Sequence, residues 1–152
     1  VLSNCSNNFG PAQHAEKLIP LMIKNIIAEK SLPVYGKGDN IRDWLYVEDH
    51  VDAIDLILHR GIIGSTYAIG GNTEKKNIDI VHKLIELVDQ KLNRPDGSSL
   101  KLIKFVNDRL GHDYRYAINT LKIEKELGWK ASTSFESGLE KTLTFYLEKI
   151  YN

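Results

Sequence analysis

The fold is decided by residues 41–61, IRDWLYVEDHVDAIDLILHRG, in which a strand passes into a helix. Residues 41–46 favour an extended conformation, and Glu48 opens a helix that ends at Gly61. Apolar side chains recur along this helix at helical spacing and predict its inner face. They are Val51, Ile54, Ile57 and Leu58. A strand joined to a helix is the repeating unit of an α/β fold.

The segments on either side of this unit continue the alternation of strands and helices. Strands are expected at residues 1–6, 32–35, 66–69 and 100–106. Helices are expected within residues 12–30, 77–93 and 119–127, and after the capping residues 133–136. We expect Pro20 to kink or break the first of these helices, and Asn77 to cap the second. The strands are few and the first has no preceding helix to cover it, which suggests an α/β sheet that belongs to a larger fold.

Composition describes an ordinary globular chain and excludes several classes of protein. The 152 residues include 20 basic and 20 acidic side chains and are 42% hydrophobic, which predicts one domain, residues 1–152. The balanced charge argues against a nucleic-acid partner, because phosphate backbones favour a basic face. No apolar run approaches the roughly 20 residues that span a bilayer, so no membrane segment is expected. Cys5 is the only cysteine, so no intramolecular disulfide can form and a reducing cytoplasm is the expected location.

Motifs for cofactor binding and catalysis are absent from the sequence. The glycines do not form the fingerprint of a dinucleotide-binding turn, and no tyrosine is followed four residues later by lysine. The five histidines are never paired one helical turn apart, so no metal site is expected. Glu48 and Asp49 fall in a first helical turn, where interaction with the helix dipole is favoured over a catalytic carboxylate pair. We therefore assign no catalytic residue.

Two arginines and a polar turn suggest a pocket for a polyanion. Residues 108–113, DRLGHD, place four groups that can ionise or bind phosphate around one glycine. Arg42 and the pair Asn7 and Asn8 add further polar groups. The planar guanidinium of arginine matches two phosphate oxygens and stays charged. Arg42 and Arg109 each adjoin an aspartate, so the pattern alone leaves open a second interpretation, ion pairing on the surface.

Six strings, in order along the chain, carry a resemblance to a known family. They are residues 3–11 (SNCSNNFGP), 16–21 (EKLIPL), 32–38 (LPVYGKG), 41–50 (IRDWLYVEDH), 74–77 (EKKN) and 108–113 (DRLGHD). Through these strings the sequence resembles the dTDP-glucose 4,6-dehydratases, a branch of the extended short-chain dehydrogenase/reductase family. The string at residues 41–50 is specific to this branch. The sequence departs from the family pattern at Leu110, where proline is usual, and at Phe9, where tyrosine is usual.

The resemblance implies an α/β fold that forms the C-terminal, substrate-binding portion of such an enzyme. Residues 1–5 and 66–69 would be the last strands of its Rossmann sheet. Family members carry an N-terminal Rossmann portion that holds NAD and supplies a Tyr-x-x-x-Lys pair and a Thr-Asp-Glu set, which are not found here. With NAD they oxidise the sugar at C4, eliminate water across C5 and C6, and return the hydride to C6. We therefore expect this chain to be inactive without the missing N-terminal portion, and the complete enzyme to be a homodimer.

The resemblance also assigns residues to a binding site for a dTDP-sugar. Asn7 would contact the substrate, and Asn8 the nicotinamide end of NAD. The nucleotide pocket would be lined by Lys17, Leu18, Pro33, Val34 and Tyr35. The dTDP moiety would be surrounded by Arg42, Asn77, Arg109 and His112, with the two arginines clamping the diphosphate. The loop would be completed by Asp108, Leu110 and Gly111, and Asp108 would orient Arg109.

Two other functions stay open at this point. One is that of another sugar-nucleotide dehydratase, an epimerase or a decarboxylase. The pocket around Tyr35 and Asn77 should distinguish it through the relative affinities for dTDP, UDP and GDP. The other is that of a non-catalytic module that binds a nucleotide sugar or another protein and has lost the reaction.

Overall fold

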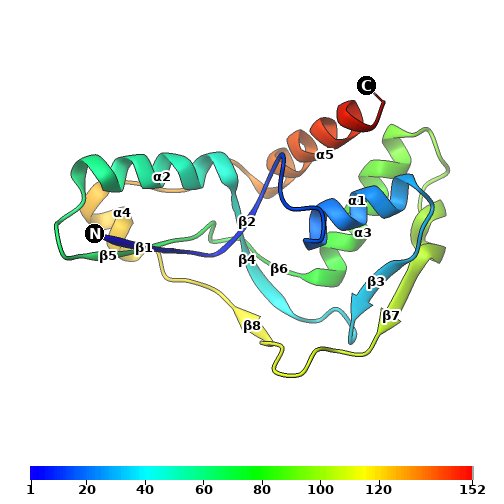
Figure 1. The fold of residues 1–152 in the computed structure, drawn as a ribbon, viewed down its shortest axis with the longest axis horizontal. Helices are drawn as coiled ribbons and strands as arrows, with labels where there is room; N and C mark the ends of the chain where they lie inside the picture. The colour runs from blue at the N-terminus through cyan, green and yellow to red at the C-terminus, as the bar shows by residue number, and fades with distance from the viewer. Residues whose placement is uncertain (152) are drawn as a thin grey trace.

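Short strands alternate with helices along the chain, as the computed structural model shows for residues 1–151 (Figure 1). The strands are β1 (Leu2–Cys5), β2 (Asn7–Phe9), β3 (Leu32–Tyr35), β4 (Ile41–Tyr46), β5 (Thr66–Ile69), β6 (Glu74–Lys76), β7 (Ile103–Val106) and β8 (Arg115–Tyr116). The helices are α1 (Leu18–Ile27), α2 (Val47–Arg60), α3 (Asn77–Lys91), α4 (Leu121–Leu127) and α5 (Phe135–Tyr151), with a 3-10 turn η1 (Ser98–Leu102) before β7. The expected α/β class is confirmed.

The strands pair in small groups. β1 pairs with β5 in parallel, and β3 pairs with β7 in parallel. β4 is the centre of the third group, because it pairs with β2 and β8 in parallel and with β6 in antiparallel orientation. Within residues 1–151, β1 has a strand partner along one edge only. Its other edge therefore has no neighbouring strand in this part of the chain and is open to one.

Buried apolar side chains form two clusters, one on each side of β4. The first cluster lies among α1, α3, α5 and strands β2 to β4, and consists of Phe9, Ile19, Met22, Ile23, Ile26, Leu32, Val34, Trp44, Tyr46, Ile80, Val81, Leu84, Ile85, Leu87, Val88, Phe135, Leu139 and Leu143. The second cluster lies among α2, α4 and β5, and consists of Leu45, Ala53, Ile57, Tyr67, Ile69, Ile123, Leu127 and Trp129. In Figure 1 the two groups of helices lie at opposite ends of the molecule.

β4 joins the two clusters because successive side chains of a strand point to opposite faces. Trp44 and Tyr46 belong to the first cluster, whereas Leu45 between them belongs to the second. All three side chains are buried. The strand that opens the segment 41–61 therefore serves two cores at once, which explains why this segment decides the fold.

Two expectations about the helices and strands on the first-cluster side are wrong. Pro20 does not break a helix, because α1 begins at Leu18 and the proline lies in its first turn. An N–H in the first turn of a helix has no partner within the helix, so proline is tolerated there. The strand expected at residues 100–106 begins only at Ile103, because the residues before it form the 3-10 turn.

The expected inner face of α2 is confirmed at Ile57 and wrong at its other three positions. Val51, Ile54 and Leu58 are 58%, 44% and 78% exposed, and the buried positions are Asp49, Ala53 and Ile57. These three positions are spaced by four residues and so lie on one face of the helix. α2 therefore presents a second, apolar stripe outward, and nothing in residues 1–151 covers it.

Asp49 has a structural role at the start of α2. Its side chain is buried and accepts hydrogen bonds from the hydroxyl of Ser132 at 2.9 Å and the backbone N–H of Thr133 at 3.0 Å. It thereby attaches the first turn of α2 to the segment before α5. In the part of the chain that the structure describes, no helix combines the length and apolar character needed to cross a bilayer.

Candidate functional site

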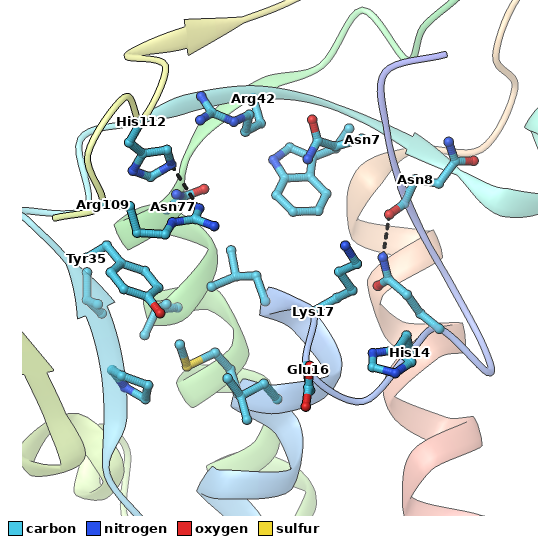
Figure 2. A pocket seen from close by; sticks show the side chains of 18 residues that line it. Asn7, Asn8, His14, Glu16, Lys17, Tyr35, Arg42, Asn77, Arg109 and His112 are labelled. Atoms are coloured by element: carbon cyan, nitrogen blue, oxygen red, sulfur yellow. Dashed lines mark hydrogen bonds between the residues drawn. The ribbon is translucent and has the colours of Figure 1, made fainter. Parts of the chain in front are cut away.

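A cavity of about 640 Å³ lies beside the first cluster (Figure 2). Its walls come from β2 and the segment after it, the first turns of α1 and α3, β3, β4 and the loop after β7. The expected site residues that line it are Asn7, Asn8, Lys17, Leu18, Pro33, Val34, Tyr35, Arg42, Asn77, Arg109 and His112. The fold thus gathers around one space residues that are distant in the sequence.

The two ends of the cavity carry different polar groups. Tyr35, Arg109 and His112 lie together on one side in Figure 2, and we name this side the basic end. Asn8 lies on the opposite side. Its backbone carbonyl accepts a hydrogen bond from Gln13 Nε2 at 2.8 Å, and we name this pair the amide end. A ligand that spans the cavity would meet different chemistry at its two ends.

At the basic end, Asp108, Arg109 and His112 form a chain of hydrogen bonds. Asp108 Oδ1 accepts from His112 Nδ1 at 2.6 Å and from the backbone N–H of Arg109 at 2.8 Å. A carboxylate only accepts, so Nδ1 of His112 carries the proton and its Nε2 accepts from Arg109 Nη2 at 3.2 Å. The hydrogen bond from His112 lowers the pKa of Asp108. Asp108 therefore reaches the guanidinium of Arg109 through His112 rather than directly.

The ring of Tyr35 also contacts the guanidinium of Arg109. The guanidinium carbon of Arg109 lies 4.9 Å from the centre of the Tyr35 ring, a cation–π distance. The remaining loop residues expected at the site are Asp108, Leu110 and Gly111, and none of them lines the cavity. Leu110 is fully exposed, and Gly111 has a positive φ of 72° that lets the loop turn.

Arg42 does not pair with the adjacent Asp43. Its guanidinium donates to the backbone carbonyls of Ile41 at 2.7 Å and Asp113 at 2.8 Å. Asp43 is buried and accepts from the backbone N–H groups of Gly71 at 3.1 Å and Thr73 at 2.7 Å. Among residues 1–151 the guanidinium groups of Arg42 and Arg109 have no carboxylate partner, so the interpretation as surface ion pairs is wrong. Both positive charges remain available to an anion in the cavity.

Asn77 lines the cavity and does not cap α3. The helix begins at Asn77 itself, and no side chain caps it. The reason lies in the preceding turn, because the carbonyls of Asn40 and Gly38 accept the N–H groups of Asn77 and Ile78, each at 3.0 Å. Gly38 has a φ of 74°, and a Cβ there would come within 2.8 Å of Val34 and Ile78. The Asn77 amide is consequently free to contact a ligand.

Sequence reasoning missed several residues of the cavity wall. They are Gln13, His14, Glu16, Leu21, Met22, Trp44 and Val81. Leu21 and Met22 follow Leu18 by three and four residues, and Val81 follows Asn77 by four. Helical spacing from the expected residues would therefore have found these three. Trp44 follows Arg42 by two residues in β4, so strand alternation indicates it too, whereas no comparable signal indicates Gln13.

The side chain of Asn8 has one atom without a partner. Its Nδ2 donates to Cys5 Sγ at 3.2 Å and to the carbonyl of Ser6 at 3.1 Å. Its Oδ1 is buried and accepts no hydrogen bond within residues 1–151. Asn8 can therefore accept a hydrogen bond from a ligand that donates one.

Comparison with known proteins identifies the family. The family described as GDP-mannose 4,6 dehydratase matches residues 1–142 of this chain. The chain belongs to this family. Among curated relatives, the dTDP-glucose 4,6-dehydratase of Escherichia coli is 53% identical over 147 residues, which cover 97% of this chain and 40% of the relative. The chain thus spans about 40% of the length of the curated relatives it matches.

Solved structures of this family share the fold. The dTDP-glucose 4,6-dehydratase of Bacillus anthracis in complex with NAD is 45% identical and matches with a TM-score of 0.84 over 96% of this chain and 44% of its own. The enzyme of Streptomyces venezuelae with NAD and dTDP is 40% identical, with a TM-score of 0.86 over 96% of this chain and 43% of its own. These structures confirm the expected fold class, an α/β portion of an extended short-chain dehydrogenase.

Proposed function

We propose that this chain, residues 1–152, binds a deoxythymidine diphosphate sugar as the substrate-holding portion of a dTDP-glucose 4,6-dehydratase. The observation that carries the proposal is the meeting of Arg42 and Arg109 around one cavity, with no carboxylate partner for either within residues 1–151. Two guanidinium groups suit a diphosphate, which offers oxygens to both. Relatives and solved structures named dTDP-glucose 4,6-dehydratase support the choice of substrate class.

The remaining contacts follow from the geometry of the cavity. Tyr35 and Asn77, beside Arg109, would receive the base, with Lys17 and Leu18 at the start of α1 next to the phosphates. Pro33 and Val34 supply apolar wall. Asn7 would touch the sugar. Asp108 and His112 would hold Arg109 in place, and Leu110 and Gly111 would shape their loop.

The proposal includes NAD as the cofactor of the complete enzyme. NAD, when bound to the complete enzyme, would supply the hydride acceptor and donor that this class of reaction needs. Only Asn8 of this chain would contact it, and its unpartnered Oδ1 fits a donor such as the nicotinamide carboxamide. This chain has no Tyr-x-x-x-Lys pair. Its own contribution is to bind the nucleotide and orient the sugar.

A Rossmann portion on further polypeptide is the proposed partner. The apolar stripe of α2 and the open edge of β1 lie at the same end of the molecule (Figure 1), and a sheet with a covering layer would bury both. The resemblance extends the proposal to a homodimer of the complete enzyme in the cytoplasm, where the lone Cys5 stays reduced. Incubated alone with NAD and dTDP-glucose, the chain should form no 4-keto product.

Thermal unfolding in the presence of dTDP tests the nucleotide site. A ligand that binds only the folded chain at about 100 times its Kd adds about 2.7 kcal/mol to the free energy of unfolding, so Tm should rise by several degrees. Arg42→Ala and Arg109→Ala should remove the rise. Arg60→Ala, at the exposed end of α2, is the matched control and should keep it.

The outcome separates the proposal from the two alternatives. A larger shift with UDP or GDP than with dTDP would indicate a different sugar-nucleotide enzyme. A dTDP shift that survives both arginine substitutions would refute the diphosphate clamp. If none of the three nucleotides changes the Tm of the folded chain, the function is that of an interaction module and the proposal is wrong.

A further inference from the structure

Some buried polar atoms have no hydrogen-bond partner within residues 1–151, and two of them belong to Asn8 and Gln13 at the amide end of the cavity. In residues 1–151, the side-chain atoms that are buried and lack a hydrogen bond are Ser6 Oγ, Asn8 Oδ1, Gln13 Oε1 and Trp44 Nε1. Three of these residues line the cavity. A buried polar atom without a partner is costly, so such a group needs an explanation. Asn8 is already assigned to the cofactor, which leaves Gln13 and Trp44.

Trp44 offers a donor in a fixed position. Its side chain is only 6% exposed and packs edge-on against Phe9 and Phe135, with ring centres 6.1 and 6.4 Å away. Its backbone lies in β4 opposite Asn7. The indole N–H can only donate. Because both phenylalanines belong to the first cluster, this donor is directed by the core rather than by the ligand.

Gln13 offers an acceptor whose orientation is also fixed. Its Nε2 donates to the carbonyl of Asn8 at 2.8 Å, and a carbonyl cannot donate in return, so Oε1 must be the free atom of this amide. Its backbone carbonyl accepts from the hydroxyl of Tyr146 at 2.8 Å, which ties the segment to α5. Gln13 therefore presents an acceptor, and Trp44 a donor, in the wall of the same cavity.

We propose that Trp44 and Gln13 form a subsite for the hydroxyl groups of the sugar. A hydroxyl both donates and accepts, so a sugar can satisfy an indole N–H and an amide oxygen together. A diphosphate only accepts and would leave Gln13 Oε1 without a donor. A pyrimidine base carries both kinds of group, but Tyr35 and Asn77 receive it at the basic end. The inference rests on the proposed function and adds the position of the sugar, at the amide end next to Asn8.

Comparison of dTDP with dTDP-glucose tests this subsite. Trp44→Phe removes the N–H and keeps an aromatic ring, and calorimetry on the full chain should show about fivefold weaker binding of dTDP-glucose, the size of one hydrogen bond, with unchanged binding of dTDP. Trp129→Phe is the matched control, because Trp129 is similarly buried but belongs to the second cluster. It should leave both affinities unchanged.

A spectroscopic measurement keeps the test valid if Trp44→Phe does not fold. The chain has two tryptophans, so the Trp129→Phe protein shows a single indole ¹H–¹⁵N signal, that of Trp44. We expect dTDP-glucose to shift this signal and dTDP to leave it in place. Equal shifts with both ligands, or none with bound dTDP-glucose, would overturn the subsite while leaving the diphosphate site intact. If neither ligand binds the parent chain, the proposed function fails and the subsite fails with it.

Discussion

α3 and α2 have nearly the same length, 15 and 14 residues, but they differ in what they bury. α3 lies against α1 and has a broad apolar face inside the first cluster, with Leu84 fully buried at its centre. α2 buries only a narrow face, Asp49, Ala53 and Ile57, and exposes the apolar side chains Val51, Ile54 and Leu58. The helix beside the cavity is thus covered by its own chain, whereas the helix on the second-cluster side is covered on one face only.

This difference shows which part of the chain completes its own hydrophobic packing. The cavity is built on α1, α3 and β4, which share the first cluster, so its shape depends on packing that residues 1–151 complete themselves. The apolar stripe of α2 contributes little to that packing. We therefore expect substitutions on the two helices to have very different consequences, and nucleotide binding to depend on the α3 side.

Truncation of one leucine on each helix should give the largest contrast. Leu84→Ala should lower the free energy of unfolding by about 3 kcal/mol, because it removes buried methyl groups and leaves a cavity. Leu58→Ala should change it by less than about 0.5 kcal/mol, because Leu58 is 78% exposed. Urea denaturation followed by circular dichroism measures both values. Equal losses would show that α2 is covered after all and would remove the contrast.

Asp43 connects the two regions and should give the next largest effect. Its carboxylate in β4 accepts the backbone N–H groups of Gly71 and Thr73 in the turn after β5. Asp43→Asn replaces one acceptor oxygen by a donor, so one buried N–H loses its partner and the free energy of unfolding should fall by about 2 kcal/mol. Asp52→Asn on the exposed side of α2 is the control and should leave the free energy of unfolding unchanged. Urea denaturation measures both variants. A silent Asp43→Asn would mean that this connection contributes nothing.

Asp108 should affect ligand binding more than stability. Without the Asp108 carboxylate, His112 can carry its proton on Nε2. That nitrogen would then no longer accept the hydrogen bond from the Arg109 guanidinium. Asp108→Ala should therefore weaken dTDP binding about fivefold, whereas Asp108→Asn, which retains an acceptor, should restore most of the affinity. Calorimetry gives the affinities, and the free energy of unfolding should stay within about 0.5 kcal/mol because the loop is exposed. Similar losses for alanine and asparagine would contradict the positioning role.

Local patterns predicted the elements well but not which face of α2 is covered. The strand expected at residues 41–46 is confirmed. On α2 the apolar stripe through Val51 and Ile54 is a true feature of the helix. Periodicity in the sequence shows that such a stripe exists. It does not show which element covers the stripe, because that depends on tertiary packing and the covering element can lie outside α2 and its neighbours in sequence.

Charged residues of the cavity wall could be predicted from the sequence, whereas residues that matter through the orientation of one polar atom were missed. Arg42 and Arg109 attracted attention because guanidinium groups suit phosphate, and the structure brings both to one space. Gln13 and Trp44 carry no such signal. Their interest arises from hydrogen-bonding atoms that the fold leaves unpaired, and only three-dimensional placement reveals which atoms those are.

His50 on α2 should give the smallest effect, through pH. Burial lowers the pKa of His50 from its usual 6.5, because the charged form is disfavoured. When the pH falls from about 7.5 to about 5.5, the unfolded chain therefore takes up this proton before the folded chain does, and the free energy of unfolding decreases. His50→Gln should reduce the decrease, and His59→Gln, an exposed position on the same helix, should not. Denaturation at both pH values measures this, and identical pH responses of the parent and His50→Gln would show that the inner face of α2 is as open to water as its outer one.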